Sequence, residues 1–476
     1  MHEVISLSFS QKSNNVLTHF YNLQESLLYD GSLSGKIDNG IHLLRKRGND
    51  RRTFNYYPRA LLWDFYNGFG ALSKYEYFEP KIDMKSLSEK FDSDTTLTTD
   101  DEKLGKNGYQ KALDGGKATG DLADHSRMKY WSDFSKVIYR PESLMRLDRW
   151  EYSFDTQQGH LRSHPEIRFD RYDVGCDEFD EDHSAGIDAV EDNFRRILEN
   201  CDTINGLNTI TELDTSWAGF TNKFLTIVKD QYLPKAPIFV WSLTDDGATK
   251  SLPLVRQISR IKSLVALLNN SSLYMPVSTY PEDVLPQWVD AKSNWQISSY
   301  QVVPMELVNQ LILPLESSRR VSLNEFAAGL TGDSTERNIV SDINLPKGCI
   351  SCKNTFRSAK PRNTHVFGKS TIGDCKVDDT ESLKEYGTSE RCIRRYRQNI
   401  PFDNTLDSFP KQFREATDSF EWCSLEITDK PKDSLDEMLR IVSRYCRDDE
   451  REDLKDSLSN LKEQYEWGFE DDEEYD

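Results

Sequence analysis

Long apolar runs are missing from this chain of 476 residues. A helix needs roughly 20 consecutive apolar residues to cross a bilayer, and the apolar stretch PIFVWSL (237–243) is much shorter. A run of that length is typical of a buried strand. We therefore expect no transmembrane segment, and any contact with a membrane should be peripheral.

An excess of positive charge is also missing. The chain has 80 acidic and 60 basic residues, which gives a formal net charge of -20. General nucleic-acid binders and polybasic membrane anchors need the opposite sign of charge. The composition thus argues against direct nucleic-acid binding and leaves proteins as the expected partners.

Cysteines are few and scattered, with eight in the whole chain, and the start of the sequence does not resemble a secretory signal. Transit peptides of the mitochondrial interior are rich in Arg and poor in acidic residues. The opening MHEVISLSFS instead carries Glu3 and alternates like a strand. These features predict a cytosol-facing protein whose fold begins near residue 3.

The common catalytic and metal-binding patterns are missing as well. The sequence has no G-x-S-x-G, no G-x-x-x-x-G-K-[ST] and no H-E-x-x-H. Cys349 and Cys352 have the spacing of zinc ligands, but Cys375 and Cys392 follow at irregular distances. We interpret the pair as structural thiols of undetermined role and predict no metal site and no catalytic residue.

Two histidines are candidates for further metal ligands. His160 and His164 lie four residues apart and could be joined by Cys176, but Gly159 and Pro165 argue against one helical face. Separate surface histidines are the simpler interpretation.

What the sequence does contain is an alternation of strands and helices. A short apolar strand is followed by the polar loop Ser10–Asn14 and then by a helix with Val16, Phe20 and Leu23 on one face. A second strand is expected in 56–65, and residues 186–240 supply helix, strand, loop, helix and strand. This order predicts an α/β fold with a parallel, Rossmann-type sheet and flanking helices.

The whole sequence divides into four segments. Residues 1–240 should form the first domain, with a polar, aperiodic insertion at about 91–124 whose removal should leave the fold intact. We expect an α+β intermediate domain over 241–345, an irregular insertion over 346–404, and a helical region with an acidic tail over 405–476.

The first unit resembles the opening of tubulins, M-R-E-I-V-H-I-Q-A-G-Q-C-G-N-Q, with Met1, Glu3, Gln11 and Asn14 matching without a gap. YPRALLWD (57–64) and CDTINGLN (201–208) are similar to further tubulin segments. Within that superfamily, the stretches 13–26, 58–65 and 130–134 resemble the Misato family. Members of that family are tubulin-related proteins implicated in mitochondrial distribution, morphology and DNA inheritance.

The resemblance also implies where a guanine nucleotide would bind. Tubulins hold phosphate with the loop G-G-G-T-G-S-G, because glycines let backbone N–H groups approach phosphate oxygens at a helix N-terminus. Here the aligned residues 214–220 read DTSWAGF, without one identity. We expect a vestigial site, whose binding of nucleotide is doubted, at the following positions: Gln11, Asn14, Asp64, Asp155, Asp214, Ser216 and Gly219.

Plainer interpretations of these residues stay open. Asp214 would cap the helix that begins near Trp217 and so use the donors that a phosphate needs. Gln11 would be an inherited loop residue, and Asp64 would begin a turn. Asp155 would add a second carboxylate to the phosphate region.

The resemblance therefore implies a non-enzymatic, tubulin-like protein of mitochondrial partitioning and mitochondrial DNA inheritance, without a required cofactor. It should act in the cytoplasm and peripherally on the cytosolic face of mitochondria. One alternative is a weak GTP-binding GTPase that polymerises. Another is a tubulin assembly factor whose partners are tubulin or its folding machinery.

Overall fold

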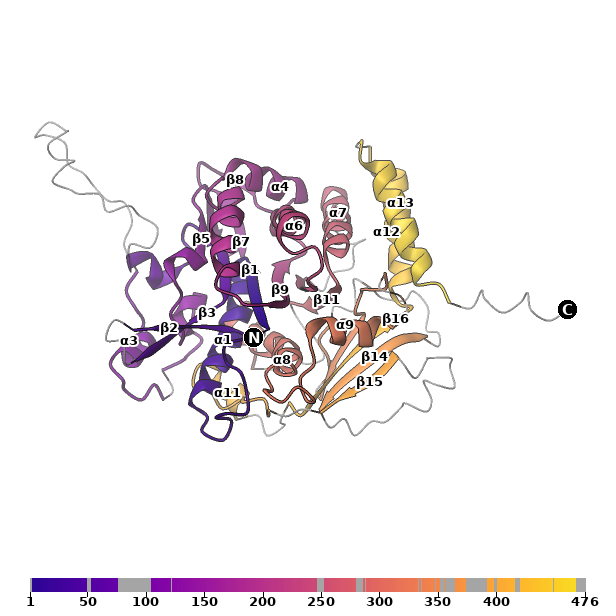
Figure 1. The fold of residues 1–476 in the computed structure, drawn as a ribbon. Coiled ribbons are helices and arrows are strands. Elements are labelled where there is room, and N and C mark those ends of the chain that lie inside the picture. The colour runs from indigo at the N-terminus through magenta and orange to yellow at the C-terminus, as the bar shows by residue number, and fades with distance from the viewer. Residues whose placement is uncertain are drawn as a thin grey trace, which may run out of the picture.

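A parallel six-stranded sheet forms the centre of the fold (Figure 1). The computed structural model describes residues 2–48, 53–75, 104–120, 122–245, 252–279, 286, 288–332, 334, 336–346, 348–351, 356, 364–373, 392–397, 400–415, 420–447 and 449–467. The strand order is β11-β10-β9-β1-β4-β5, and every neighbouring pair is parallel. The predicted α/β fold with a tubulin-like, Rossmann-type sheet is confirmed.

The six strands are β1 (Glu3–Phe9), β4 (Ala60–Phe65), β5 (Leu144–Leu147), β9 (Ile204–Glu212), β10 (Ile238–Thr244) and β11 (Leu273–Ser278). Two small antiparallel sheets flank them, made of β2 (Leu43–Arg47) with β3 (Phe54–Pro58), and of β6 (Trp150–Ser153), β7 (Gln158–Leu161) and β8 (His164–Arg168).

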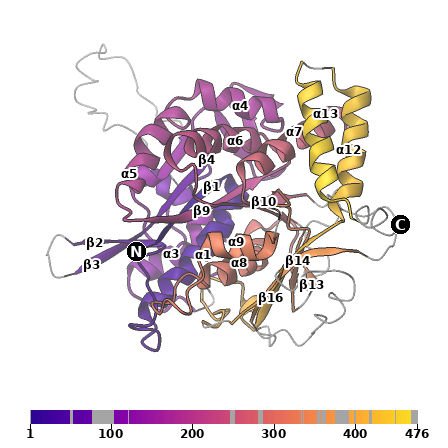
Figure 2. The ribbon, with the colours of Figure 1, turned by 45° about the vertical axis from the view of Figure 1, so that its right-hand side comes forward.

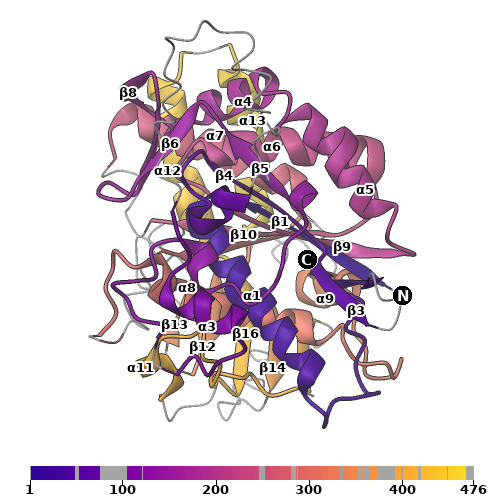
Figure 3. The ribbon, with the colours of Figure 1, turned by 90° about the vertical axis from the view of Figure 1, so that its left-hand side faces the viewer.

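Helices cover both faces of the central sheet (Figures 1 and 3). One face carries α1 (Gln11–Tyr29) and α8 (Asn294–Gln310), and the other carries α4 (Tyr172–Glu181), α6 (Trp217–Ile227) and α7 (Leu254–Asn270). Shorter helical segments are η1 (Gly70–Tyr75), α3 (Gly108–Asp114), η2 (Trp131–Phe134), η3 (Pro141–Ser143), η4 (Ala189–Phe194), α5 (Arg195–Leu198), η5 (Val228–Tyr232) and α11 (Lys411–Arg414).

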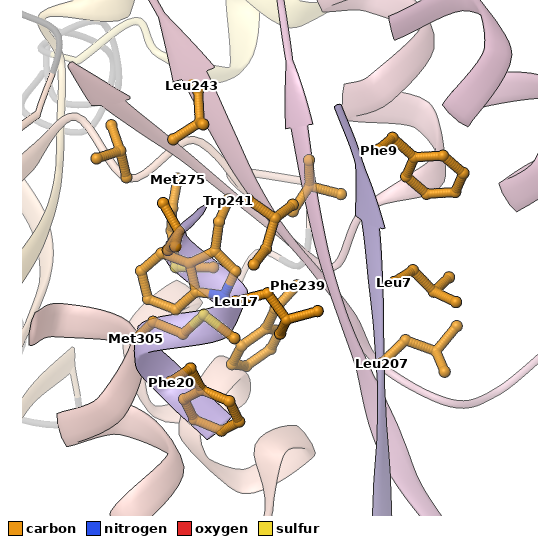
Figure 4. Close-up of a cluster of buried hydrophobic side chains, with 14 of the residues drawn as sticks. Leu7, Phe9, Leu17, Phe20, Leu207, Phe239, Trp241, Leu243, Met275 and Met305 are labelled. Atoms are coloured by element: carbon orange, nitrogen blue, oxygen red, sulfur yellow. The ribbon is translucent and has the colours of Figure 1, made fainter. Parts of the chain in front are cut away.

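Alternation along the strands sends apolar side chains to both helical layers. Leu7, Phe9 and Leu207 point to one side of the sheet (Figure 4). On the other side Phe239 and Trp241 lie with side chains of α1 and α8, namely Leu17, Phe20 and Met305. The helical face predicted from the first 30 residues is confirmed, since Val16, Phe20, Leu23 and Leu27 are all buried.

A second sheet follows in the chain and mixes strand directions. Its order is β13-β12-β16-β14-β15, with one parallel pair, β14 with β15. The strands are β12 (Asp342–Leu345), β13 (Gly348–Cys349), β14 (Val366–Gly373), β15 (Ile393–Tyr396) and β16 (Trp422–Thr428). Helix α9 (Leu323–Thr331) lies against this sheet, and the pair α12 (Pro431–Tyr445) and α13 (Arg451–Gln464) stands beside α7 (Figure 2).

The predicted segment boundaries differ from this architecture. The first sheet continues through β11 to Ser278, so it passes the boundary placed at residue 240. The second sheet takes β14 and β15 from the stretch 346–404 expected to be irregular, and β16 from the region 405–476 expected to be helical. A Cβ on Gly368 of β14 would overlap the Leu330 carbonyl oxygen of α9, so this glycine serves a close approach that no local pattern predicts.

The expected insertion 91–124 is also structured in part. Residues 91–103 and 121 lie outside the described residues, but α3 occupies 108–114, and its Tyr109 is fully buried. Asn107 caps this helix by accepting from the Gln110 amide at 2.8 Å. The interpretation of the whole stretch as an aperiodic loop is therefore wrong for this helix, whose two buried residues are a weak signal among polar neighbours. Whether the fold survives removal of the stretch stays a prediction.

No helix within the described ranges is both long enough and apolar enough to cross a membrane.

Candidate functional site

Three loops meet at the carboxyl ends of the central strands. β1 ends at Phe9 and pairs there with Thr211 of β9, so the loop Ser10–Asn14 and the loop that starts at Leu213 leave the same edge of the sheet. β4 ends at Phe65 on the other side of β1. Both segments that align with tubulin phosphate loops therefore lie at this edge. We call Gln11, Asn14, Asp64, Glu212 and Asp214 the strand-end site.

The first turn of α1 is closed by its own side chains. Ser10 has φ 126°, in the region that favours glycine, and its Oγ accepts from the Ser13 amide at 3.1 Å. The Ser13 hydroxyl donates to the Phe9 carbonyl oxygen at 3.1 Å. A helix N-terminus attracts anions through its unpaired N–H groups, and here the Ser13 amide already has a partner.

Asp64 is completely buried, and two other candidates, Gln11 and Asn14, bind its carboxylate. Asn14 Nδ2 donates to Asp64 Oδ2 at 3.1 Å, and Trp131 Nε1 donates to the same oxygen at 2.9 Å. With its amide oriented to satisfy both ends, Gln11 donates to Asp64 Oδ2 at 2.6 Å and to the Gly68 carbonyl oxygen at 3.2 Å. Gln11 and Asn14 thus contact Asp64 directly.

Burial raises the pKa of Asp64 to about 7, although the hydrogen bonds from Phe65, Trp131 and Asn14 oppose the shift. The nearby Glu212 carboxylate adds to the increase. The carboxyl group of Asp64 therefore keeps its proton to a much higher pH than an exposed aspartate does. Asp64 lies within β4, and the turn follows from residue 66, so Asp64 does not itself begin that turn. Its Oδ1 accepts from the Phe65 amide at 2.8 Å.

A second carboxylate enters the site from the end of β9. Glu212 lies 3.4 Å from the ammonium group of Lys12, which is 3.7 Å from Asp245. Burial raises the pKa of Glu212, and Lys12 opposes that shift. The sequence analysis missed Lys12 and Glu212, although an acidic residue at the carboxyl end of a strand is a usable signal.

Asp214 pairs with a helix that follows 40 residues later. Its carboxylate bonds to Arg260 of α7 and accepts from the Asp245 amide at 2.8 Å. Arg260 and Asp214 are both buried, with side-chain exposures of 1% and 7%. Arg256, one turn earlier, donates to the Asp214 carbonyl oxygen at 2.8 Å.

The N-cap interpretation of Asp214 is therefore wrong. Ser216 occupies the N-cap of α6, without a side-chain cap bond, and its Oγ accepts from the Arg171 amide at 2.9 Å. The long-range pairing with Arg260 decides the position of Asp214, since a buried carboxylate is stabilised more by a guanidinium than by a single amide donor.

Trp217 and Gly219 belong to the aligned segment 214–220 but lie in the first turn of α6, where they take part in packing. Trp217 is 1% exposed and contacts the rings of Phe65, Phe169 and Phe220. A Cβ on Gly219 would overlap the Tyr172 carbonyl oxygen, so this glycine lets α6 approach α4.

Asp155 lies apart from the other candidates. It is exposed in the turn between β6 and β7. Among the described residues, no hydrogen bond or ion pair joins its carboxylate to a residue of the strand-end site. Tyr152, three residues earlier, is the part of this hairpin that approaches the site. The charges of Lys12, Glu212 and Asp64 all act on the pKa of its hydroxyl group.

Family comparisons agree with this architecture. Residues 2–115 match the Misato Segment II tubulin-like domain, and residues 121–313 match a tubulin domain. Protein DML1 of Debaryomyces hansenii is 32% identical over 500 residues, which cover 100% of both chains. The chain belongs to the Misato family of tubulin-like proteins.

Two further Misato-family relatives cover the same length. Protein DML1 of Kluyveromyces lactis is 28% identical over 509 residues, covering 100% of this chain and 99% of the relative. Protein DML1 of Yarrowia lipolytica is 27% identical over 494 residues, covering 100% of both. These names carry no enzyme designation.

Among the described residues of this Misato-family chain, no group of three or more His, Cys, Asp or Glu side chains is placed to hold a metal ion. His164 is exposed and lies 3.3 Å from Glu166. The Cys349 sulfur contacts the Ser351 hydroxyl at 2.9 Å, whereas Cys352 and Cys375 lie outside the described residues.

Proposed function

We propose that this Misato-family protein is a non-enzymatic scaffold that acts in mitochondrial distribution, morphology, partitioning and mitochondrial DNA inheritance. It works through its surfaces on protein partners, from the cytoplasm and peripherally on the cytosolic face of mitochondria. Family membership supports the process. The ion pairs within the strand-end site support the proposal that the protein neither binds nor hydrolyses GTP.

One observation carries the non-enzymatic part of the proposal: the protein's own side chains already form ion pairs at the edge where a phosphate chain would lie. Arg260 is bonded to Asp214, and Lys12 lies between Glu212 and Asp245. An incoming phosphate would meet carboxylates, and the cations that could attract it are already neutralised.

The energetic balance opposes GTP. Freeing Arg260 for a phosphate would leave the buried Asp214 carboxylate without its charged partner, which costs about 3–5 kcal/mol. A micromolar affinity corresponds to about 8 kcal/mol of binding free energy. Losing 3–5 kcal/mol of that would raise the dissociation constant to between about 0.2 and 5 mM.

Titration of the purified full chain with fluorescent GTP and Mg²⁺ tests this part. We expect no saturable binding up to about 100 μM nucleotide, a hundredfold above a micromolar dissociation constant, and no phosphate release. Saturable low-micromolar binding that Gln11→Ala or Ser216→Ala weakens would contradict the proposal. Thr226→Ala is the matched control, because Thr226 lies exposed on the same helix as the Ser216 cap.

Protease treatment of intact mitochondria tests the location. We expect the bound protein to be digested while a matrix marker survives. Protection equal to that of the matrix marker would contradict a cytosolic-face location.

Depletion distinguishes the proposed process from tubulin assembly. The scaffold proposal expects abnormal mitochondrial distribution and loss of mitochondrial DNA with microtubules unchanged. Loss of assembled tubulin before any mitochondrial change would favour the tubulin assembly factor.

A further inference from the structure

A cavity of about 720 Å³ opens at the amino ends of β9 and β10, at the opposite edge of the sheet from the strand-end site. Four parts of the chain line it: His2 just before β1, the start of β9, the connection 232–237 before β10, and the segment 317–325 that leads into α9. Its volume lies within the usual range of small-molecule sites.

Cationic groups outnumber anionic ones on the cavity wall. The ammonium group of Lys235 and the guanidinium group of Arg320 line it together with one carboxylate, that of Glu325. This balance contrasts with the net charge of -20 for the whole chain. Lys235 is exposed and makes no ion pair with any described residue.

Two of the donors are held in place by the surrounding structure. Arg320 Nε donates to the Pro314 carbonyl oxygen at 2.8 Å, which orients the guanidinium group. Asn205 is only 8% exposed, and its Oδ1 accepts from the Leu323 amide at 2.9 Å. That bond fixes the carboxamide, and its Nδ2 donates to no acceptor within the described ranges.

The N-terminus of an adjoining helix forms part of the same wall. α9 begins at Leu323 and its N-cap Ser322, which lines the cavity, accepts from the Glu325 amide at 3.1 Å. The Glu325 amide and the Leu323 amide are thus already bonded within the protein. The donors that remain for a ligand at this wall are side chains.

We propose that this cavity binds a phosphate monoester. A guanidinium, an ammonium and a carboxamide N–H offer several donors to the oxygens of one phosphate group, and arginine suits that geometry best. Two sources share this chemistry, a soluble ester such as glycerol 3-phosphate and the headgroup of phosphatidic acid in a membrane. The proposal does not depend on the absence of GTP binding at the other edge.

Two binding assays with the full-length protein distinguish the sources. Calorimetric titration with glycerol 3-phosphate, with glycerol as the uncharged control, measures the soluble ester. Sedimentation with phosphatidylcholine vesicles, with and without phosphatidic acid, measures the lipid. Saturable binding in the first assay alone assigns a soluble ligand, and binding that needs phosphatidic acid assigns the headgroup.

Four variants locate the binding. Lys235→Glu should weaken it about tenfold. Asn205→Asp should weaken it similarly, because it replaces the free donor by an anion and keeps the oxygen that accepts from Leu323. Glu325→Gln should strengthen it, since it removes the one repelling charge. Lys111→Glu, an exposed charge reversal on α3, is the matched control and should leave binding unchanged.

Thermal unfolding of each variant separates loss of binding from loss of fold. Absence of binding in both assays by a folded wild-type protein would overturn the proposal. It would also be overturned if Lys111→Glu weakened binding as much as Lys235→Glu, or if Asn205→Asp and Glu325→Gln left the affinity unchanged.

Discussion

Replacing Arg260 by Met should strongly destabilise the protein, because it leaves the Asp214 carboxylate buried without a charged partner. The two side chains are 1% and 7% exposed, so little water can take the place of the guanidinium. The Asp245 amide, at 2.8 Å, remains as a donor. Removing one partner of a buried ion pair costs about 3–5 kcal/mol.

A double-mutant cycle attributes the loss to the charge. Asp214→Asn keeps the shape of the side chain and removes its charge, so Arg260→Met combined with Asp214→Asn should be more stable than Arg260→Met alone. We expect a difference of about 1–3 kcal/mol, the usual size of coupling between contacting residues. Urea unfolding followed by tryptophan fluorescence and far-UV circular dichroism measures each corner of the cycle.

Arg195→Met provides the control, because Arg195 is 55% exposed and its partners Asp192 and Glu199 are exposed as well. Its loss should change the unfolding free energy by at most about 1 kcal/mol. The reasoning would be refuted if Arg260→Met cost no more than Arg195→Met, or if the added Asp214→Asn substitution brought no recovery.

Three further predictions concern the core, the helix crossing and the pH dependence. Tyr109→Ala should lower the unfolding free energy by about 3–5 kcal/mol, because Tyr109 is fully buried; Tyr29→Ala, at a residue 78% exposed, should be near neutral in the same urea assay. Gly175→Ala should raise the unfolding rate and cost about 1–3 kcal/mol or more, because the new Cβ would overlap the Ser216 carbonyl oxygen, whereas Gly31→Ala meets no atom within 4 Å and should not. Burial raises the pKa of Asp64 to about 7 in the folded protein, so the folded protein keeps this proton at pH values at which an unfolded Asp has lost it. The contribution of this group to the unfolding free energy is therefore present at low pH and is lost as the pH rises to 7. Asp64→Asn should therefore flatten the fall in unfolding free energy between about pH 4 and pH 7. Parallel curves for the variant and the wild type would contradict this assignment.

Local sequence patterns were sufficient to predict the elements whose buried residues recur with a regular period within one short stretch. The alternation in Glu3–Phe9 and the apolar face of the following helix predicted β1 and α1, since both periods are local properties of the backbone. The order of strands and helices then placed the loops after β1 and β9 at one edge, because parallel strands share their carboxyl ends.

Contacts between distant segments decided the rest. Asp214 and Arg260 are 46 residues apart, and a cap within its own helix was the only partner that local sequence offered for Asp214. The strand β14 lies between β15 and β16, and its glycine allows the approach of α9, so its place in the second sheet depends on tertiary packing.

The sequence by itself determined the family, the parallel sheet and the edge at which the candidate residues gather, because these follow from local periodicity and strand order. Only the tertiary structure decided which charges pair there. Ion pairing depends on distances between side chains from different elements, and those distances exist only once the helices have packed on the sheet.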